Sequence, residues 1–241
     1  MTSIDGPMTE PGRTWERGVR LGVRNFRDAG GVGALPRGTL FRSAALHGLA
    51  LEDAEALRRL ELRTVVDLRS GPEMAERPDA VEVVRAGYVR YLHVPVFEER
   101  RWPADQMELY PLMAERAGSA AVAVVRRLLA DDGAPVLVHC ASGKDRTGVV
   151  VAVVQTLMGA SDEEVLQDFL RSNTELGLVA DPSAAGAAVA HGSLPVLATH
   201  LHRAMLWIRS HHGSVPDYLL AHGLTASQLS AVRETISRGT P

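Results

Sequence analysis

The middle of the chain reads Val138-His139-Cys140-Ala141-Ser142-Gly143-Lys144-Asp145-Arg146-Thr147-Gly148. An apolar run before Cys140 predicts a strand, and the apolar run after Thr147 predicts a helix. Small and polar residues join the two as a tight loop. Because successive N–H groups of such a loop point inward at a helix N-terminus, we expect a binding site for an anion.

Two side chains of this loop carry chemistry. Cys140 lies at the floor of the predicted cradle, where the same dipoles stabilise the thiolate, the nucleophilic form of cysteine. Arg146 can bind two oxygens of one phosphate in a bidentate geometry that lysine does not reproduce. A free cysteine is often a buried packing residue, but the glycine and the charged residues beside Cys140 are atypical of a core strand. The loop therefore predicts a site in which Cys140 is the nucleophile and Arg146 binds the oxygens of the same phosphate.

Strand and helix patterns alternate around the loop. Short apolar runs predict strands at 39–42, 64–68, 89–94 and 135–139. Helical patterns cover 51–60, 119–130, 148–158, 161–172, 194–211, 216–222 and 225–237. The glycine-rich stretch 22–38 is expected to be an irregular loop. We therefore expect an α/β fold, with a central, mostly parallel sheet flanked by helices and a helical C-terminal half.

Composition indicates one domain. The 241 residues are 46% hydrophobic and 23% charged, with a formal net charge of -3, and a chain of this length buries a sizeable core. We expect a disordered tail at 1–18, a single catalytic domain at 19–241 and a mobile lid at 178–193. The near-neutral charge argues against binding to nucleic acid, which needs a basic face.

The sequence shows no signal for secretion or membrane insertion. Cys140 is the single cysteine, so no disulfide forms within the chain. The N-terminus lacks the basic start and apolar core of a secretory signal. The most apolar run, 149–158, is shorter than the stretch of about 18 residues that a membrane span requires. We therefore expect a cytoplasmic protein without an integral membrane segment.

The His139-Cys140 pair, followed by five residues and Arg146, resembles the catalytic loop of cysteine-based protein tyrosine phosphatases. The fuller His-Cys-x-x-Gly-Lys-Asp-Arg-Thr-Gly form is similar to bacterial members that also act on phosphoinositides. Five outer segments resemble landmarks of that family, in its order: Asn25-Phe-Arg-Asp28, Leu40-Phe-Arg-Ser43, Val66-Asp-Leu-Arg-Ser70, Asp168-Phe-Leu-Arg-Ser-Asn173 and Gly213-Ser-x-x-x-Tyr218-Leu. The resemblance implies hydrolysis of phosphotyrosine, and of phosphoserine, phosphothreonine or phosphoinositides, without metal or cofactor.

The resemblance also implies roles for the loop residues. Cys140 attacks phosphorus and forms a cysteinyl-phosphate, which water hydrolyses. Arg146 and the loop amides stabilise the equatorial oxygens. Thr147 donates to the thiolate, and His139 orients the loop. The implied phosphate-binding set is His139, Ala141, Ser142, Gly143, Lys144 and Thr147.

Two carboxylates compete for the role of general acid, which must reach the leaving oxygen. Glu98 follows the run 92–96 at a position where the family carries an aspartate, and Asp145 lies inside the loop. Asp105 is a third acid on the same segment as Glu98. The sequence slightly favours Asp145.

Three further residues are expected to support the pocket. Lys144 is the only lysine of the chain, and the resemblance implies that it helps to bind substrates with extra negative charge. Asp67 and Arg69 end a predicted strand, near the sheet edge where α/β proteins bind ligands.

Other functions fit the sequence less well. A sulfurtransferase or arsenate reductase also uses a loop cysteine, but arsenate reduction normally needs partner cysteines, and sulfurtransferase loops lack the Lys-Asp-Arg-Thr run. A catalytically weak module that binds phosphorylated ligands is the other alternative, and retention of both Cys140 and Arg146 argues for turnover. Helix neighbours such as His200 and His202 point apart, so we expect no metal site.

Overall fold

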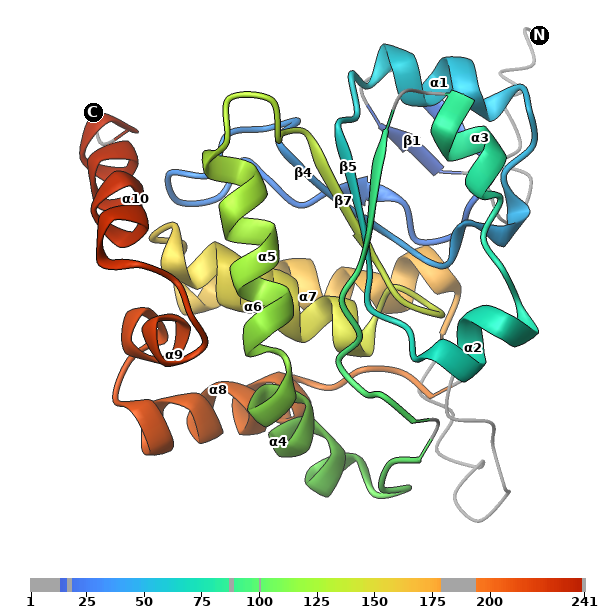
Figure 1. Ribbon diagram of the computed structural model, residues 1–241. Helices are drawn as coiled ribbons and strands as arrows, with labels where there is room; N and C mark the ends of the chain where they lie inside the picture. Colours follow the sequence, from blue (N-terminus) through green and yellow to red (C-terminus); the bar gives the residue numbers. More distant parts are fainter. Residues whose placement is uncertain (1–13, 17–18, 87–88, 100, 179–193, 240–241) are drawn as a thin grey trace, which may run out of the picture.

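The computed structural model of the protein describes residues 14–16, 19–86, 89–99, 101–178 and 194–239 (Figure 1). Its central sheet has five strands in the order β3-β4-β7-β5-β6. These strands are β3 (Arg27–Asp28), β4 (Leu40–Ser43), β5 (Thr64–Asp67), β6 (Arg90–His93) and β7 (Val136–His139). The last four are parallel, and β3 pairs antiparallel with β4. The prediction of a mostly parallel sheet is confirmed.

Three strands fall where none was expected. β3 interrupts the stretch 22–38, so the expectation of a loop without strands was wrong at Arg27–Asp28, where pairing with β4 outweighs the turn propensity of the flanking glycines. A separate two-stranded sheet joins β1 (Thr14–Glu16), which lies within the predicted tail, to β2 (Val19–Leu21). The expected lid at 178–193 lies outside the described residues except for Leu178.

Seven helices confirm the helical patterns of the sequence: α1 (Asp53–Arg59), α5 (Gly118–Leu129), α6 (Asp145–Leu157), α7 (Asp162–Leu176), α8 (Ala198–His212), α9 (Val215–Ala221) and α10 (Ala226–Gly239). Four further segments were not predicted: the 3₁₀ turn Leu46–Gly48, α2 (Gly71–Glu76), α3 (Val81–Ala86) and α4 (Gln106–Arg116). The first three are too short to show a helical period. α4 carries Pro111 in its interior, which disfavours a helix locally.

Helices cover both faces of the sheet (Figure 1). Val66 and Val138 belong to the larger apolar cluster, with α5 and α6. Their neighbours Val65 and Leu137 belong to a second cluster, with α1 and α3. Because alternate side chains of a strand face opposite sides and both sides are buried, the central residues of β5 and β7 are apolar.

The register of the sheet brings three strand ends together. His139 at the end of β7 is paired with Ser43 of β4 and with Asp67 of β5. Ligands of parallel α/β sheets bind at this carboxyl edge, so the predicted catalytic loop starts where such a site is expected.

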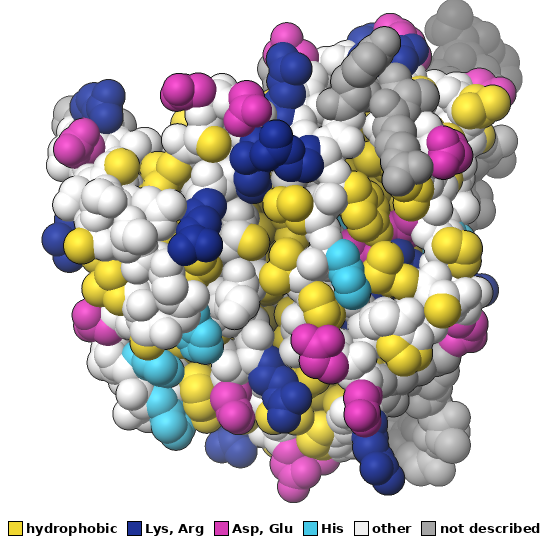
Figure 2. All heavy atoms as spheres, in the orientation of Figure 1, with side chains coloured by type: hydrophobic (Ala, Val, Ile, Leu, Met, Phe, Trp, Pro, Cys, Tyr) yellow, Lys and Arg dark blue, Asp and Glu magenta, His cyan; other side chains and the backbone are white. Residues whose placement is uncertain are grey.

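The surface agrees with the near-neutral formal charge of -3. Figure 2 shows acidic and basic side chains mixed over the face in view. In the described part of the chain, no helix combines the length and the apolar character that crossing a bilayer needs.

Candidate active site

The loop after β7 turns sharply onto the end of β4. Gly143 has a φ of +69°, and a Cβ added there would lie 2.1 Å from the carbonyl oxygen of Ser43. Only glycine tolerates both the left-handed backbone and this close approach. The turn keeps Cys140 buried, with 2% of its surface exposed, at the floor of the loop.

The back of the loop is held through its carbonyl groups. Nδ2 of Asn25 donates to the carbonyl oxygens of Ser142, at 3.0 Å, and of Gly143, at 2.9 Å. Nη2 of Arg42 also donates to the Gly143 oxygen, at 2.8 Å. In a trans peptide the following N–H points opposite to the carbonyl. The N–H groups of Gly143 and Lys144 therefore point away from Asn25.

α7 supplies the counterion for this scaffold. Asp168 accepts from Nη1 of Arg42 at 2.6 Å and from Nε of Arg27 at 3.0 Å. Burial alone would raise the pKa of Asp168, but the two guanidinium groups outweigh it and hold that pKa below its ordinary value. A buried ion-pair network therefore ties α7 to the loop.

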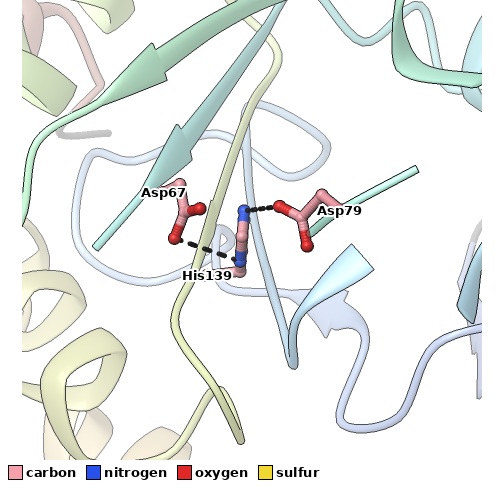
Figure 3. Close-up of side chains that lie close together, drawn as sticks. All are labelled: Asp67, Asp79 and His139. Atoms are coloured by element: carbon pink, nitrogen blue, oxygen red, sulfur yellow. Dashed lines mark ion pairs between the residues drawn. The ribbon is translucent and has the colours of Figure 1, made fainter. Parts of the chain in front are cut away.

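A second buried network surrounds His139 (Figure 3). Its Nε2 lies 3.2 Å from Oδ2 of Asp79, and its Nδ1 lies 3.8 Å from Oδ1 of Asp67. Arg69 forms ion pairs with both carboxylates, at 2.7 and 2.8 Å, and the hydroxyl of Tyr91 lies 2.6 and 2.7 Å from them. Burial opposes ionisation of Asp79, yet His139 and Arg69 lower its pKa to about 2.

The acids of this network and His139 lie close enough together to hold a metal ion. However, the guanidinium of Arg69 already contacts Asp67 and Asp79. A cation placed beside this guanidinium would be repelled by it, so we interpret the group as a structural support at the end of β7. Asp67 and Arg69 thus lie behind His139, at the expected sheet edge.

Arg146, at the start of α6, faces an acid that the sequence analysis missed. Its Nη1 and Nη2 donate to the two carboxylate oxygens of Glu73 on α2, at 2.6 and 2.7 Å. Glu73 also accepts from the backbone N–H of Ser70, which completes a capping box. Burial opposes ionisation, but Arg146 lowers the pKa of Glu73 to about 2. The Ser-x-x-Glu spacing is a sequence signal for α2, although it does not reveal the contact with Arg146.

Asp145 lies beneath a tyrosine from α4. The hydroxyl of Tyr110 donates to Oδ1 of Asp145 at 2.6 Å, while Nζ of Lys144 lies 3.5 Å from Oδ2. Lys144 is buried, and its ammonium also donates to the carbonyl oxygen of Leu194. Thr147 is buried, and its hydroxyl has no hydrogen-bond partner among the described residues.

The remaining two acids differ in environment. Glu98 is exposed, directly after the buried Phe97. Phe97 packs against Trp102, with ring centroids 5.6 Å apart, and the guanidinium carbon of Arg146 lies 5.3 Å from the centroid of Trp102. The segment that carries Glu98 therefore borders the loop. Asp105 caps the N-terminus of α4 through the N–H of Met107.

The chain is similar to several known proteins. A triple specificity protein phosphatase, PtpB of Mycobacterium tuberculosis, is 29% identical over an alignment of 267 positions, gaps included, that covers 88% of this chain and 96% of that protein. A putative tyrosine-protein phosphatase of Cupriavidus necator is 28% identical and covers 82% of this chain and 80% of its own length. The solved structure of the kinase associated phosphatase aligns with a TM-score of 0.48 at 11% identity, covering 78% of this chain and 94% of its own.

The family assignment rests on the sequence model described as "Tyrosine phosphatase family", which matches residues 20–237. The match includes the cysteine loop, the sheet and all helices from α1 to α9. The chain therefore belongs to the tyrosine phosphatase family, and it is a phosphoric monoester hydrolase of that type.

Proposed function

We propose that this enzyme hydrolyses phosphotyrosine through a cysteinyl-phosphate formed on Cys140. The observation that carries the proposal is the buried thiol below a loop whose carbonyl groups are held from behind, which leaves its amides for the phosphate. Such amides, at the N-terminus of α6, stabilise both the thiolate and the phosphoryl oxygens.

In the first step, the thiolate of Cys140 forms a bond to phosphorus, and the bond to the leaving oxygen breaks. The leaving oxygen takes the electron pair of that bond and a proton from a carboxylic acid. In the second step, water attacks phosphorus, the bond to sulfur breaks and the electron pair returns to Cys140, while the proton of water passes to a carboxylate. Arg146 binds the equatorial oxygens in both steps. Thr147, whose hydroxyl has no other partner in the described part of the chain, donates to the departing thiolate.

Asp145 is our choice for the proton carrier, because it lies inside the loop and is held by Tyr110 and Lys144. Glu98 remains the second choice. The amides of Ala141, Ser142 and Gly143 complete the phosphate site, and His139 supports it from behind.

The substrate range extends beyond phosphotyrosine. One relative is a triple specificity protein phosphatase, so we propose phosphoserine, phosphothreonine and phosphoinositides as further substrates. Trp102 places an aromatic face beside Arg146, where it suits the ring of a phosphotyrosine. The chain has a single cysteine and so does not depend on a disulfide within it, and we propose that the enzyme acts in the cytoplasm.

The first test is hydrolysis of p-nitrophenyl phosphate in the presence of EDTA. We expect turnover by the wild type, none by Cys140→Ser, and strongly reduced turnover by Arg146→Lys, which keeps the charge but loses the bidentate geometry. Rapid quenching of the wild type should trap a phosphate ester on Cys140. Turnover that survives in Cys140→Ser would refute the proposed nucleophile.

The leaving group identifies the acid. Nitrophenolate leaves without a proton, whereas phenolate needs one, so loss of the acid should slow phenyl phosphate more than p-nitrophenyl phosphate. We expect this selective loss in Asp145→Asn. Glu98→Gln is compared with Glu99→Gln, its exposed neighbour, and selective loss in Glu98→Gln alone would transfer the role to Glu98.

A further inference from the structure

α4 contributes one side chain to the loop, although the sequence gives it no catalytic motif. Tyr110 is fully buried, and its hydroxyl donates to Oδ1 of Asp145 at 2.6 Å. On its other sides, the ring stacks on His200 of α8, with centroids 4.8 Å apart, and meets Phe169 of α7 edge-on at 6.0 Å. The ring is therefore fixed between α7 and α8, while its hydroxyl reaches the loop.

This environment keeps the hydroxyl a donor. Burial and the charge of Asp145 raise the pKa of Tyr110 well above its ordinary value, so the phenol stays protonated. A hydroxyl has a single proton to donate, and here it goes to Asp145. Nζ of Lys144 forms an ion pair with the other oxygen at 3.5 Å, so the carboxylate of Asp145 has one hydrogen bond and one ion pair that restrain its rotation.

We propose that Tyr110 is a positioning residue, whose hydroxyl holds the carboxylate of Asp145 in the orientation from which it exchanges protons with the leaving group and with water. This inference rests on the proposed function and adds a residue to it. In this proposal α4 carries Tyr110 and α8 fixes its ring through the stack on His200. In Figure 1 these two helices lie together below the sheet, and their residues are in contact.

The rival explanation is that Tyr110 only fills the core. The variant Tyr110→Phe distinguishes this explanation from a positioning role. This substitution keeps the ring, and with it the contacts to His200 and Phe169, and removes only the hydroxyl. The chain offers a matched control in Tyr218→Phe. Tyr218 is also fully buried, and its hydroxyl donates to the carbonyl oxygen of Ala114 on the same helix α4, at 2.6 Å. Both variants should therefore show similar decreases in Tm.

The experiment measures kcat and KM for phenyl phosphate across pH in the wild type, Tyr110→Phe, Tyr218→Phe, Asp145→Asn and the double variant Tyr110→Phe/Asp145→Asn. We expect kcat of Tyr110→Phe to fall about tenfold, with KM nearly unchanged, because a misplaced proton carrier loses part of its effect. In Tyr110→Phe, the limb of the kcat pH profile that depends on Asp145, and that is absent in Asp145→Asn, should lie at a different pH from that of the wild type. Tyr218→Phe should keep the wild-type kcat and profile.

The double variant decides the mechanism. If Tyr110 acts through Asp145, adding Tyr110→Phe to Asp145→Asn causes no further loss. An equal loss in both backgrounds, or a wild-type kcat and pH profile in Tyr110→Phe, would overturn the inference. The proposed function is tested separately, by wild-type turnover that is lost in Cys140→Ser. If that result is obtained and the double variant shows an equal loss, only the role of Tyr110 is refuted. A wild type without turnover would overturn both.

Discussion

Replacing Glu73 with Gln tests whether an ion pair holds Arg146, the residue proposed to bind the phosphate, in position. In the native protein both Nη groups of Arg146 donate to Glu73, at 2.6 and 2.7 Å, and only 8% and 10% of the two side chains are exposed. The amide of Gln keeps the shape of the side chain but loses the charge. Its NH₂ group would also face the N–H groups of Arg146, donor against donor.

The expected loss of stability follows from the pKa of Glu73. The native value of about 2, against the ordinary 4.5, corresponds to about 3 kcal/mol at neutral pH. Because the native pKa is lowered, this stabilisation is fully present above pH 4.5 and is lost as the pH falls toward 2. Glu73→Gln should therefore lower the free energy of unfolding by about 2–4 kcal/mol at pH 7.

Urea unfolding from pH 7 down to pH 3.5 measures this difference, with Glu76→Gln on the exposed side of the same helix as the control. The gap between wild type and Glu73→Gln should close by about 1.4 kcal/mol per pH unit once the pH falls below the ordinary pKa of glutamate. A gap that is absent at pH 7, or that stays constant with pH, would refute the reasoning.

Activity should fall as well. A guanidinium has five N–H groups, so Arg146 binds Glu73 with two and keeps others for the phosphate. Without Glu73 the plane of the guanidinium is no longer fixed, and we expect kcat/KM for p-nitrophenyl phosphate to fall about tenfold or more. An unchanged kcat/KM would mean that the loop alone orients Arg146.

Three other variants or treatments test the rest of the site. Asp168→Asn leaves two buried arginines without their counterion, so it should destabilise the protein by about 3–5 kcal/mol in urea unfolding; a loss below about 1 kcal/mol would contradict this. Gly143→Ala should abolish turnover while the far-UV circular dichroism is retained, because the new Cβ would lie 2.1 Å from the oxygen of Ser43; full activity would show that the loop adapts. Peroxide should inactivate the enzyme at Cys140, and an added small thiol should restore activity, since the chain has no second cysteine to form a disulfide; resistance to peroxide would argue against a reactive thiolate, and inactivation that the thiol does not reverse would contradict the expected recovery.

Local patterns were sufficient for much of the fold. The four parallel strands and seven helices follow from apolar runs and caps, which depend on neighbours within a few residues. α4 was missed because Pro111 and its polar residues obscure the helical period. α2 and α3 have six residues each, too few for a period to show.

The sequence by itself determined the chemistry of the loop, because the cysteine, the glycine, the arginine and the helix start lie within nine consecutive residues, 140–148. Only the tertiary structure decided which partners these groups meet. Glu73 and Tyr110 lie 73 and 35 positions from their partners Arg146 and Asp145, and no local pattern encodes such distances. The packing of α2 and α4 beside the loop brings them to these partners, and burial strengthens each contact.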